Sequence, residues 1–148
     1  MKDIIRYGNE RLLAMQKTAF LASGTIAPDV VLRCYDWATG EHEGCVVSGF
    51  SSRLEQDVLH FLLRAKIPVI MVLARRLYKE IPEELKVPLE QGRLLIISTT
   101  AAVRQSRTTA LARNRYICEL ADSIMMAGVT DGSSLYVLQE TFRDKLLP

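Results

Sequence analysis

The segment ALARNRYICELADSIMM (110–126) leads from a helix into a buried strand, and its pattern decides the fold class. Apolar residues recur at helical spacing as far as position 121, and an unbroken apolar run, SIMMAG (123–128), follows directly. An unbroken run, as opposed to an alternating one, is typical of a strand that is buried on both faces of a parallel sheet. Early in this segment lie three consecutive polar residues, Arg113, Asn114 and Arg115. Such residues are unexpected on a helix that packs against a core, so their presence requires an explanation.

Four more apolar runs repeat this pattern, and helical segments separate them. The runs cover positions 18–23, 45–49, 69–73 and 94–98, and we expect helices at 29–38, 52–65, 82–90, 109–122 and 133–145. Strands that alternate with helices predict an α/β fold, a three-layer Rossmann-like domain. Its sheet is expected to be doubly wound, mostly parallel and about five strands wide, with helices on both faces. We expect 1–148 to be a single domain that includes an N-terminal helical leader (1–16), with a helix beginning at Asn9.

The charge of the chain is unevenly distributed, although its net value of +2 is too small to indicate nucleic-acid binding by itself. Positions 91–118 hold five arginines and no acidic residue. Such a segment can produce a local positive field on a nearly neutral protein. A second acid-free segment, 58–79, is interpreted as a solvated basic surface.

The apolar segments also bear on the cellular compartment. No apolar run approaches the roughly 18 residues that a membrane span needs, and the N-terminal residues lack the pattern of a secretory signal. Cys34, Cys45 and Cys118 lie inside apolar segments and are expected to be buried free thiols. We therefore expect a cytoplasmic protein without membrane contact.

Small and hydroxyl-bearing residues follow four of the five predicted strands, at 23–25, 48–52, 98–100 and 128–134. Ligands of open α/β sheets bind beyond the carboxyl ends of the strands. Helix N-termini at that end offer free N–H groups and a partial positive charge. The sequence therefore predicts an anion site, most simply one for phosphate, at this end of the sheet.

The helical period places Arg113 and Asn114 on the same stripe as Ala110, Ile117 and Ala121. An inward arginine costs free energy unless it is paired. Two explanations remain open: a buried pair with Glu55 or Asp131, or a bound anion, which a guanidinium suits well. Arg115 falls on the opposite side, where either an exposed pair with Glu119 or a ligand contact would explain it.

The segments VVSGF…E (46–55), ARNRYICELAD (112–122) and DGSSL (131–135) resemble the Rossmann-like core of DprA (Smf), the DNA-processing protein of the SLOG superfamily. The resemblance implies a binding module that takes single-stranded DNA, works with a recombination protein (the recombinase RecA) and forms homodimers. Carried over by position, it implies a pocket lined by Ser48, Gly49, Arg113, Asn114, Arg115, Gly132, Ser133 and Ser134.

The chain departs from the DprA pattern after the second predicted strand. The family has Ala-Arg-Gly-Ile-Asp where this chain has SSRLE (51–55), so Arg53 would supply the guanidinium from one position away and Glu55 would replace the acid. The family's further strand after the last helix has no expected counterpart before Pro148.

Two other functions are compatible with such a pocket. One is a small-nucleotide sensor of the SLOG type. The other is a LOG-type phosphoribohydrolase, which cleaves nucleoside monophosphates; its Pro-Gly-Gly-x-Gly-Thr-x-x-Glu loop is absent, and Glu55 is the carboxylate to test for acid–base work. His42 and His60 lack metal-ligand spacing, so we expect no metal. We expect no cofactor either, and the resemblance to DprA implies a protein that binds and does not catalyse.

The expected site collects these residues at one end of the sheet. Phe50 is included because it could stack on a base, the alternative being burial in the core. Arg104 and Arg107 would extend a track for nucleic acid beyond the pocket, and Glu55 is the acid partner. The full set for ligand or phosphate binding is Ser23, Gly24, Thr25, Ser48, Gly49, Phe50, Ser51, Ser52, Arg53, Arg113, Asn114, Arg115, Gly132, Ser133 and Ser134.

Overall fold

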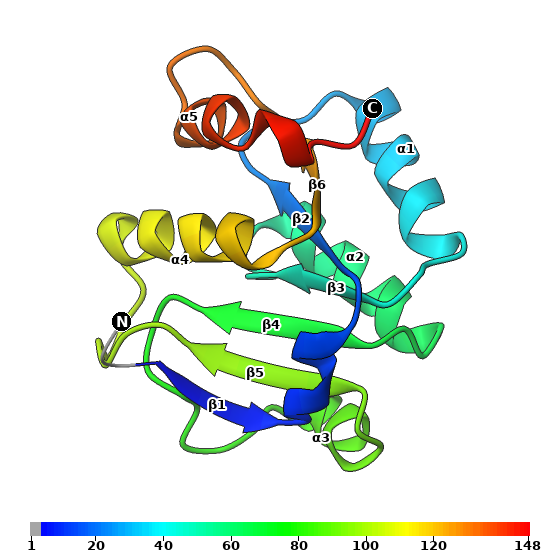
Figure 1. Ribbon diagram of the computed structural model, residues 1–148, viewed down its shortest axis with the longest axis vertical. Coiled ribbons are helices and arrows are strands. Elements are labelled where there is room, and N and C mark those ends of the chain that lie inside the picture. The colour runs from blue at the N-terminus through cyan, green and yellow to red at the C-terminus, as the bar shows by residue number, and fades with distance from the viewer. Residues whose placement is uncertain (1–3) are drawn as a thin grey trace.

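One sheet of six strands, in the order β1-β5-β4-β3-β2-β6, organises the computed structural model, which describes residues 4–148 (Figure 1). The strands are β1 (Ile5–Gly8), β2 (Lys17–Ala22), β3 (Cys45–Ser48), β4 (Val69–Leu73), β5 (Leu94–Ser98) and β6 (Ser123–Ala127). Strands β2 to β6 are parallel, and β1 pairs antiparallel with β5. The predicted α/β class and the mostly parallel sheet are confirmed, with one strand more than expected.

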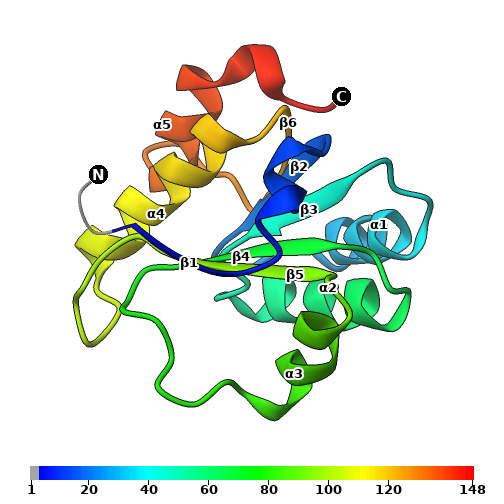
Figure 2. The same ribbon diagram turned by 60° about the horizontal axis from the view of Figure 1, so that its bottom comes forward.

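Helices cover both faces of this sheet (Figure 2). They are α1 (Pro28–Thr39), α2 (Arg53–Arg64), α3 (Glu83–Glu90), α4 (Arg107–Leu120) and α5 (Ser134–Thr141), with 3-10 turns η1 (Glu10–Ala14) and η2 (Arg143–Lys145). One apolar core lies between the sheet and α1, α2 and α3, and a second lies between the sheet and η1, α4 and α5. The predicted three layers are therefore present.

The order of the strands fixes where connections leave the sheet. The chain passes from β2 through β3 and β4 to β5, and α4 then crosses the other face to reach β6 beside β2. The connections after β2 and β4 lead to helices on one face of the sheet, whereas those after β6 and β5 lead to helices on the other face. Connections that diverge in this way open crevices at the carboxyl ends of the strands, where α/β proteins bind ligands.

The expected helical leader is correct only in part. Residues 5–8 form strand β1 instead of helix, whereas Asn9 caps the short 3-10 helix η1 as expected, its Oδ1 accepting from the N–H of Arg11 at 3.1 Å. All four residues of β1 are exposed, so no apolar run marked the strand. Positions 1–3 of the leader lie outside the described residues.

The C-terminal segment differs from expectation as well. Helix α5 ends at Thr141 instead of 145, and Leu146 then forms a parallel bridge with Ile124 of β6. The N–H of Leu147 donates to the carbonyl of Ile124 at 2.8 Å. A one-residue counterpart of the further strand is thus present at the edge of β6.

The three cysteines are buried free thiols, as predicted. No helix within residues 4–148 is both long and apolar enough to cross a bilayer.

Candidate functional site

Strands β2 and β3 separate near their carboxyl ends, and the side chain of Glu55 lies between them. Their pairing ends at Ala19 and Val47, so the N–H of Ala22 is not taken by β3. Glu55 Oε2 accepts from Ala22 N–H at 2.9 Å, and Oε1 accepts from the N–H groups of Ser51 and Ser52 at 2.9 and 3.2 Å. Glu55 reaches all three because it is the third residue of α2, in a capping box with Ser52.

The carboxylate of Glu55 is therefore a structural tie between the β2 and β3 loops. It is 4% exposed, and both oxygens are engaged by backbone amides. A general acid or base must reach the proton that it transfers, and this carboxylate faces the backbone. The arrangement does not favour the acid–base role considered for Glu55.

Arg113 enters the same region from the opposite face of the sheet, on α4. It is 4% exposed, its Nε donates to Asn114 Oδ1 at 2.8 Å, and Nη1 makes a long hydrogen bond of 3.4 Å to the carbonyl of Val72. The guanidinium lies against Gly49, where a Cβ atom would overlap it. The inward direction predicted for Arg113 is confirmed, and Gly49 is the residue that makes room for it.

The charge of Arg113 has no ion-pair partner in the part of the chain that the structure describes. Neither of the proposed acids, Glu55 and Asp131, is bonded to it. Burial lowers the pKa of Arg113, and the nearby charge of Glu55 opposes this effect. The side chain is thus a buried cation whose acceptors are one amide oxygen and one distant carbonyl.

The turn after β3 sends Phe50 away from the expected site. Ser48 is fully buried, and its Oγ accepts from Phe50 N–H at 3.1 Å. Phe50 has a φ of +49°, a region that non-glycine residues seldom adopt. Its ring is 5% exposed and packs in the core beside α2. The expectation that Phe50 lines the rim is corrected, and core burial is the alternative that holds.

The loop after β5 carries the two arginines of the expected track, Arg104 and Arg107, and both are exposed. Arg107 is the first residue of α4, which begins with a capping box between Ser106 and Thr109. Gln105 Nε2 donates to Ser51 Oγ at 3.2 Å. This bond joins the start of α4 to the β3 loop, so helix N-termini from both faces of the sheet meet there.

Two more arginines, Arg75 and Arg76, lie in the loop after β4. The interpretation of 58–79 as a solvated surface did not place them at the same end of the sheet as the site. The N–H of Arg76 donates to Ala102 O at 2.7 Å, and Ser98 Oγ donates to Arg75 O at 2.6 Å. These bonds hold the β4 loop beside the β5 loop. Their position directly after a strand was the available signal. We call Arg53, Arg75, Arg76, Arg104 and Arg107, with the loops that carry them, the basic rim.

The remaining expected residues lie at the loops after β2 and β6. The N–H of Ser23 donates to Ala127 O at 3.3 Å, and Gly24 and Thr25 are exposed. Ser133 caps α5 by accepting from Tyr136 N–H at 3.2 Å, between exposed Gly132 and half-buried Ser134. These residues share the carboxyl end of the sheet with Gly49. Within residues 4–148 no hydrogen bond connects them to Arg113.

Arg115 points elsewhere. Its Nε lies 3.7 Å from Glu119 Oε1, and its Cζ lies 5.7 Å from the centre of the Phe142 ring. Arg115 therefore packs against the segment after α5, and of its two explanations the exposed pair with Glu119 is the one observed.

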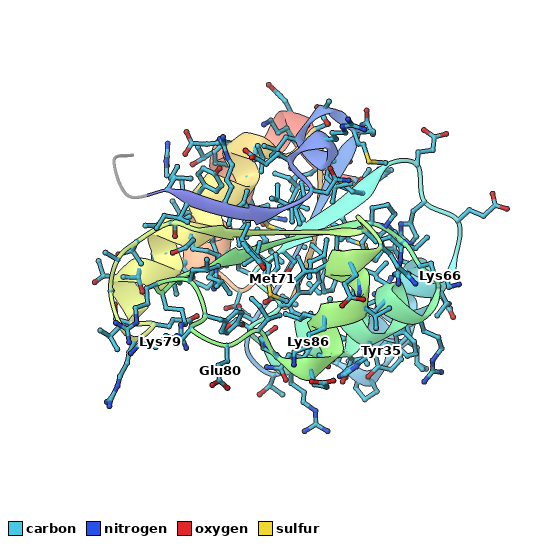
Figure 3. The ribbon with its side chains drawn as sticks, turned by 90° about the horizontal axis from the view of Figure 1, so that it is seen from below. Tyr35, Lys66, Met71, Lys79, Glu80 and Lys86 are labelled. Atoms are coloured by element: carbon cyan, nitrogen blue, oxygen red, sulfur yellow. The ribbon has the colours of Figure 1, made fainter. Side chains whose placement is uncertain are left out.

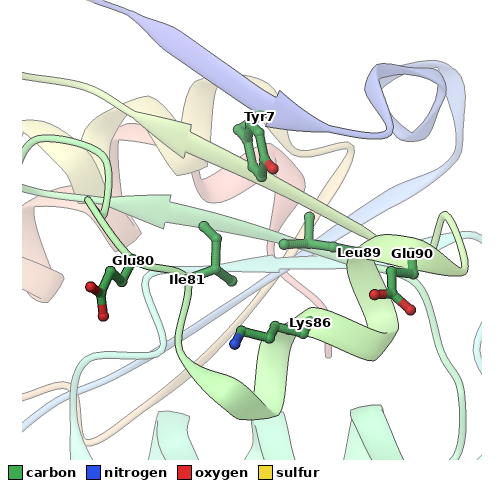
Figure 4. A pocket seen from close by; sticks show the side chains of 6 residues that line it. All are labelled: Tyr7, Glu80, Ile81, Lys86, Leu89 and Glu90. Carbon is green, nitrogen blue, oxygen red and sulfur yellow. The ribbon is translucent and has the colours of Figure 1, made fainter.

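Two hollows on the surface differ in the charge of their lining, which balances Arg53 against Asp57 in the first and has two glutamates and one lysine in the second. A hollow of about 290 Å³ opens on the rim between Gly24 and Arg53, where Tyr35 O–H donates to Asp57 Oδ2 at 2.8 Å. A hollow of about 430 Å³ lies between β1 and α3. Figure 4 shows its lining side chains: Tyr7, Glu80, Ile81, Lys86, Leu89 and Glu90. Its two glutamates make the second hollow a poor site for phosphate.

Comparisons with known proteins agree on the fold. No family model matches the sequence, and no curated protein matches it. The structure is similar to DNA processing protein A (DprA) from Streptococcus pneumoniae, with a TM-score of 0.77 and 20% identity over 98% of this chain and 54% of that chain. It is also similar to DNA processing protein A from Helicobacter pylori, with a TM-score of 0.74 and 21% identity over 97% of this chain and 69% of that one.

These matches show that the chain has the DprA-like Rossmann fold that the resemblance implied. The chain spans about half the length of the S. pneumoniae protein and about two thirds of the H. pylori protein.

Proposed function

We propose that this chain is a DprA-like module that binds single-stranded DNA along the basic rim. The observation that carries the proposal is Arg113, a buried cation directly beneath the rim without a carboxylate bonded to it. The H. pylori protein of similar fold binds single-stranded DNA. A buried charge of this kind costs free energy that an anion at the surface above it would offset.

The exposed arginines are the groups that would contact phosphates. Arg104 and Arg107 make no ion pair within residues 4–148, so both can neutralise a strand. The adjoining N-termini of α2 and α4 add N–H groups and partial positive charge. Arg113 is buried against Gly49, so it would act on the strand through its charge and not by direct contact.

The proposal is for binding without catalysis, and the position of Glu55 supports it. The carboxylate of Glu55, which was considered for acid–base work, is held by three backbone N–H groups. This arrangement leaves no base for the phosphoribohydrolase reaction at that position. The proposal includes no cofactor and no metal.

Three further properties belong to the proposal and rest on the resemblance of the sequence to DprA. They are a recombination protein as partner, a homodimer as the assembly and the cytoplasm as the compartment. Pull-down with purified recombinase, light scattering and fractionation would test them.

Fluorescence anisotropy of labelled oligo-dT, at two salt concentrations, tests the central claim. Wild type should bind more weakly at higher salt, because phosphate contacts release counterions. The double variant Arg104→Ala/Arg107→Ala should bind more weakly and lower the salt slope by about 1.4, or roughly 0.7 for each phosphate that is no longer neutralised. The control, Arg64→Ala, removes an exposed arginine from the last turn of α2, at the other end of the sheet.

Two results would contradict the proposal. The first is no binding by folded protein at low salt. The second is an equal loss in Arg64→Ala and in the double variant, which would mean non-specific attraction by the whole surface. In the first case, thermal shifts with a panel of nucleotides would examine the small-nucleotide sensor.

A further inference from the structure

A cleft of about 260 Å³ lies between α2, the segment 74–82 and α3. Its floor is apolar: Phe50, Leu59, Met71 and Leu85 are all nearly inaccessible to solvent. Figure 3 shows Met71 in the gap between the segment that carries Lys79 and Glu80 and helix α3, which carries Lys86. We call this hollow the α2–α3 cleft. It is smaller than the sites of drug-sized ligands, which start at about 300 Å³.

Polar groups surround the mouth of the cleft. Gln56 and Glu84 are exposed residues of α2 and α3, and His60 Nδ1 lies 3.9 Å from Glu84 Oε2. Tyr78 forms a half-buried wall; its phenol is neutral at pH 7, and burial raises the pKa further. The cleft therefore combines apolar side chains at its base with a mostly polar mouth, and polar groups placed in this way can fix the orientation of a small ligand.

The α2–α3 cleft adjoins the basic rim through two contacts. Phe50 follows Gly49 in the β3 loop, and Gln56 Nε2 donates to Ser51 O in that loop at 3.0 Å. On the other side, Arg75 Cζ lies 5.2 Å from the centre of the Tyr78 ring. A nucleotide whose phosphate meets Arg75 would therefore have the cleft within reach of its base.

We propose that the α2–α3 cleft binds one nucleobase of the strand, and that it prefers a base with an exocyclic amino group. The phosphate anchor in this inference rests on the proposed function, whereas the base pocket itself does not. Single-stranded nucleic acids are recognised by burying bases and bonding to their edges. The carboxylate of Glu84 accepts hydrogen bonds only, so it suits the amino groups of cytosine, adenine and guanine. Thymine offers only its N3–H, and the carbonyl oxygens on either side of that group would face the carboxylate unfavourably.

Free deoxynucleosides test the cleft without any phosphate. In ¹H–¹⁵N spectra, millimolar deoxycytidine, deoxyadenosine or deoxyguanosine should shift the amides of Leu59, Met71 and Leu85, and thymidine should shift them at least threefold less. Glu84→Ala should abolish this difference. The matched control is Glu83→Ala, which removes the neighbouring exposed carboxylate that pairs with Lys86. The inference is overturned if no nucleoside shifts these amides or if thymidine shifts them equally.

Anisotropy with oligo-dC, oligo-dA and oligo-dT separates this inference from the proposed function. Oligo-dC and oligo-dA should bind more tightly than oligo-dT in wild type, and Glu84→Ala should remove that preference without changing the salt slope. Equal, salt-dependent binding of all three oligomers would refute the base pocket and support the proposed DNA binding. Amide shifts with nucleosides, together with no oligomer binding, would instead retain the pocket and reject the proposed function.

Discussion

Replacing Glu55 with glutamine tests how the two loops at the site are held together. Glutamine keeps one acceptor oxygen and turns the other into a donor, so one of the three backbone N–H groups bound by Glu55 faces an NH₂ group. If the oxygen stays with Ser51 and Ser52, Ala22 N–H becomes a buried unsatisfied donor, which costs about 1–3 kcal/mol. The two remaining bonds lose their ionic character, about 0.5 kcal/mol each. The substitution should therefore lower the free energy of unfolding by about 2–4 kcal/mol.

Urea denaturation followed by circular dichroism, with thermal melts, measures this loss. For a chain of this size, 1 kcal/mol corresponds to about 2–4 °C, so Tm should fall by roughly 10 °C. Glu119→Gln, which changes an exposed carboxylate paired with Arg115 on α4, should cost less than about 0.5 kcal/mol. A Glu55→Gln protein within 0.5 kcal/mol of wild type would refute the role of Glu55 as the tie between the loops.

Three further predictions follow from other contacts. Gly49→Ala should destabilise the fold by about 1–3 kcal/mol because its Cβ overlaps the guanidinium of Arg113, and Gly49→Ala/Arg113→Ala should show less than the sum of the single losses in urea melts. Burial raises the pKa values of Cys45 and Cys118 to about 11, so at pH 8 roughly 0.1% of each thiol is ionised; DTNB should react slowly with native protein and fully after unfolding. Asp122 accepts from Lys17 N–H at 2.8 Å, which lowers its pKa. Because the pKa of Asp122 is lower in the folded state, its carboxylate stabilises the fold at pH values above its unfolded-state pKa, which is near 4. This stabilisation is lost as the pH falls through the folded-state pKa. Asp122→Ala should therefore cost about 0.5–1 kcal/mol at pH 7, a difference in urea melts that shrinks below pH 4.

The features that were predicted from sequence are those with a local cause. The parallel strands appear as unbroken apolar runs because both of their faces are buried. Helix starts such as Ser52 and Ser133 follow from capping side chains only a few residues away. The inward direction of Arg113 could be predicted for the same reason, because it follows from the helical period, which is a local property of the sequence.

The features that were missed depend on residues far apart in the chain. Strand β1 exists because it pairs with β5, some 90 positions later, and its four exposed residues carry no apolar signal. The environment of Arg113 comes from Gly49 and Val72, which periodicity cannot connect to α4. Phe50 turns away from the rim because it adopts a positive φ in the turn after β3. Non-glycine residues seldom adopt this conformation, so the sequence did not predict it.

Glu55 and Arg113 are the two buried charges near the rim, and the fold satisfies their hydrogen-bonding groups unequally. Both are buried charges near the carboxyl end of β3, and they approach from opposite faces of the sheet. Glu55 has its two oxygens engaged by three N–H groups, whereas Arg113 has five N–H donors and two acceptors within residues 4–148. Backbone N–H groups therefore satisfy the carboxylate of Glu55, whereas the guanidinium of Arg113 keeps unused donors. The two buried charges are opposite and act on each other, so they largely offset one another beyond the protein surface. The positive potential at the rim therefore comes chiefly from its exposed arginines, such as Arg104 and Arg107.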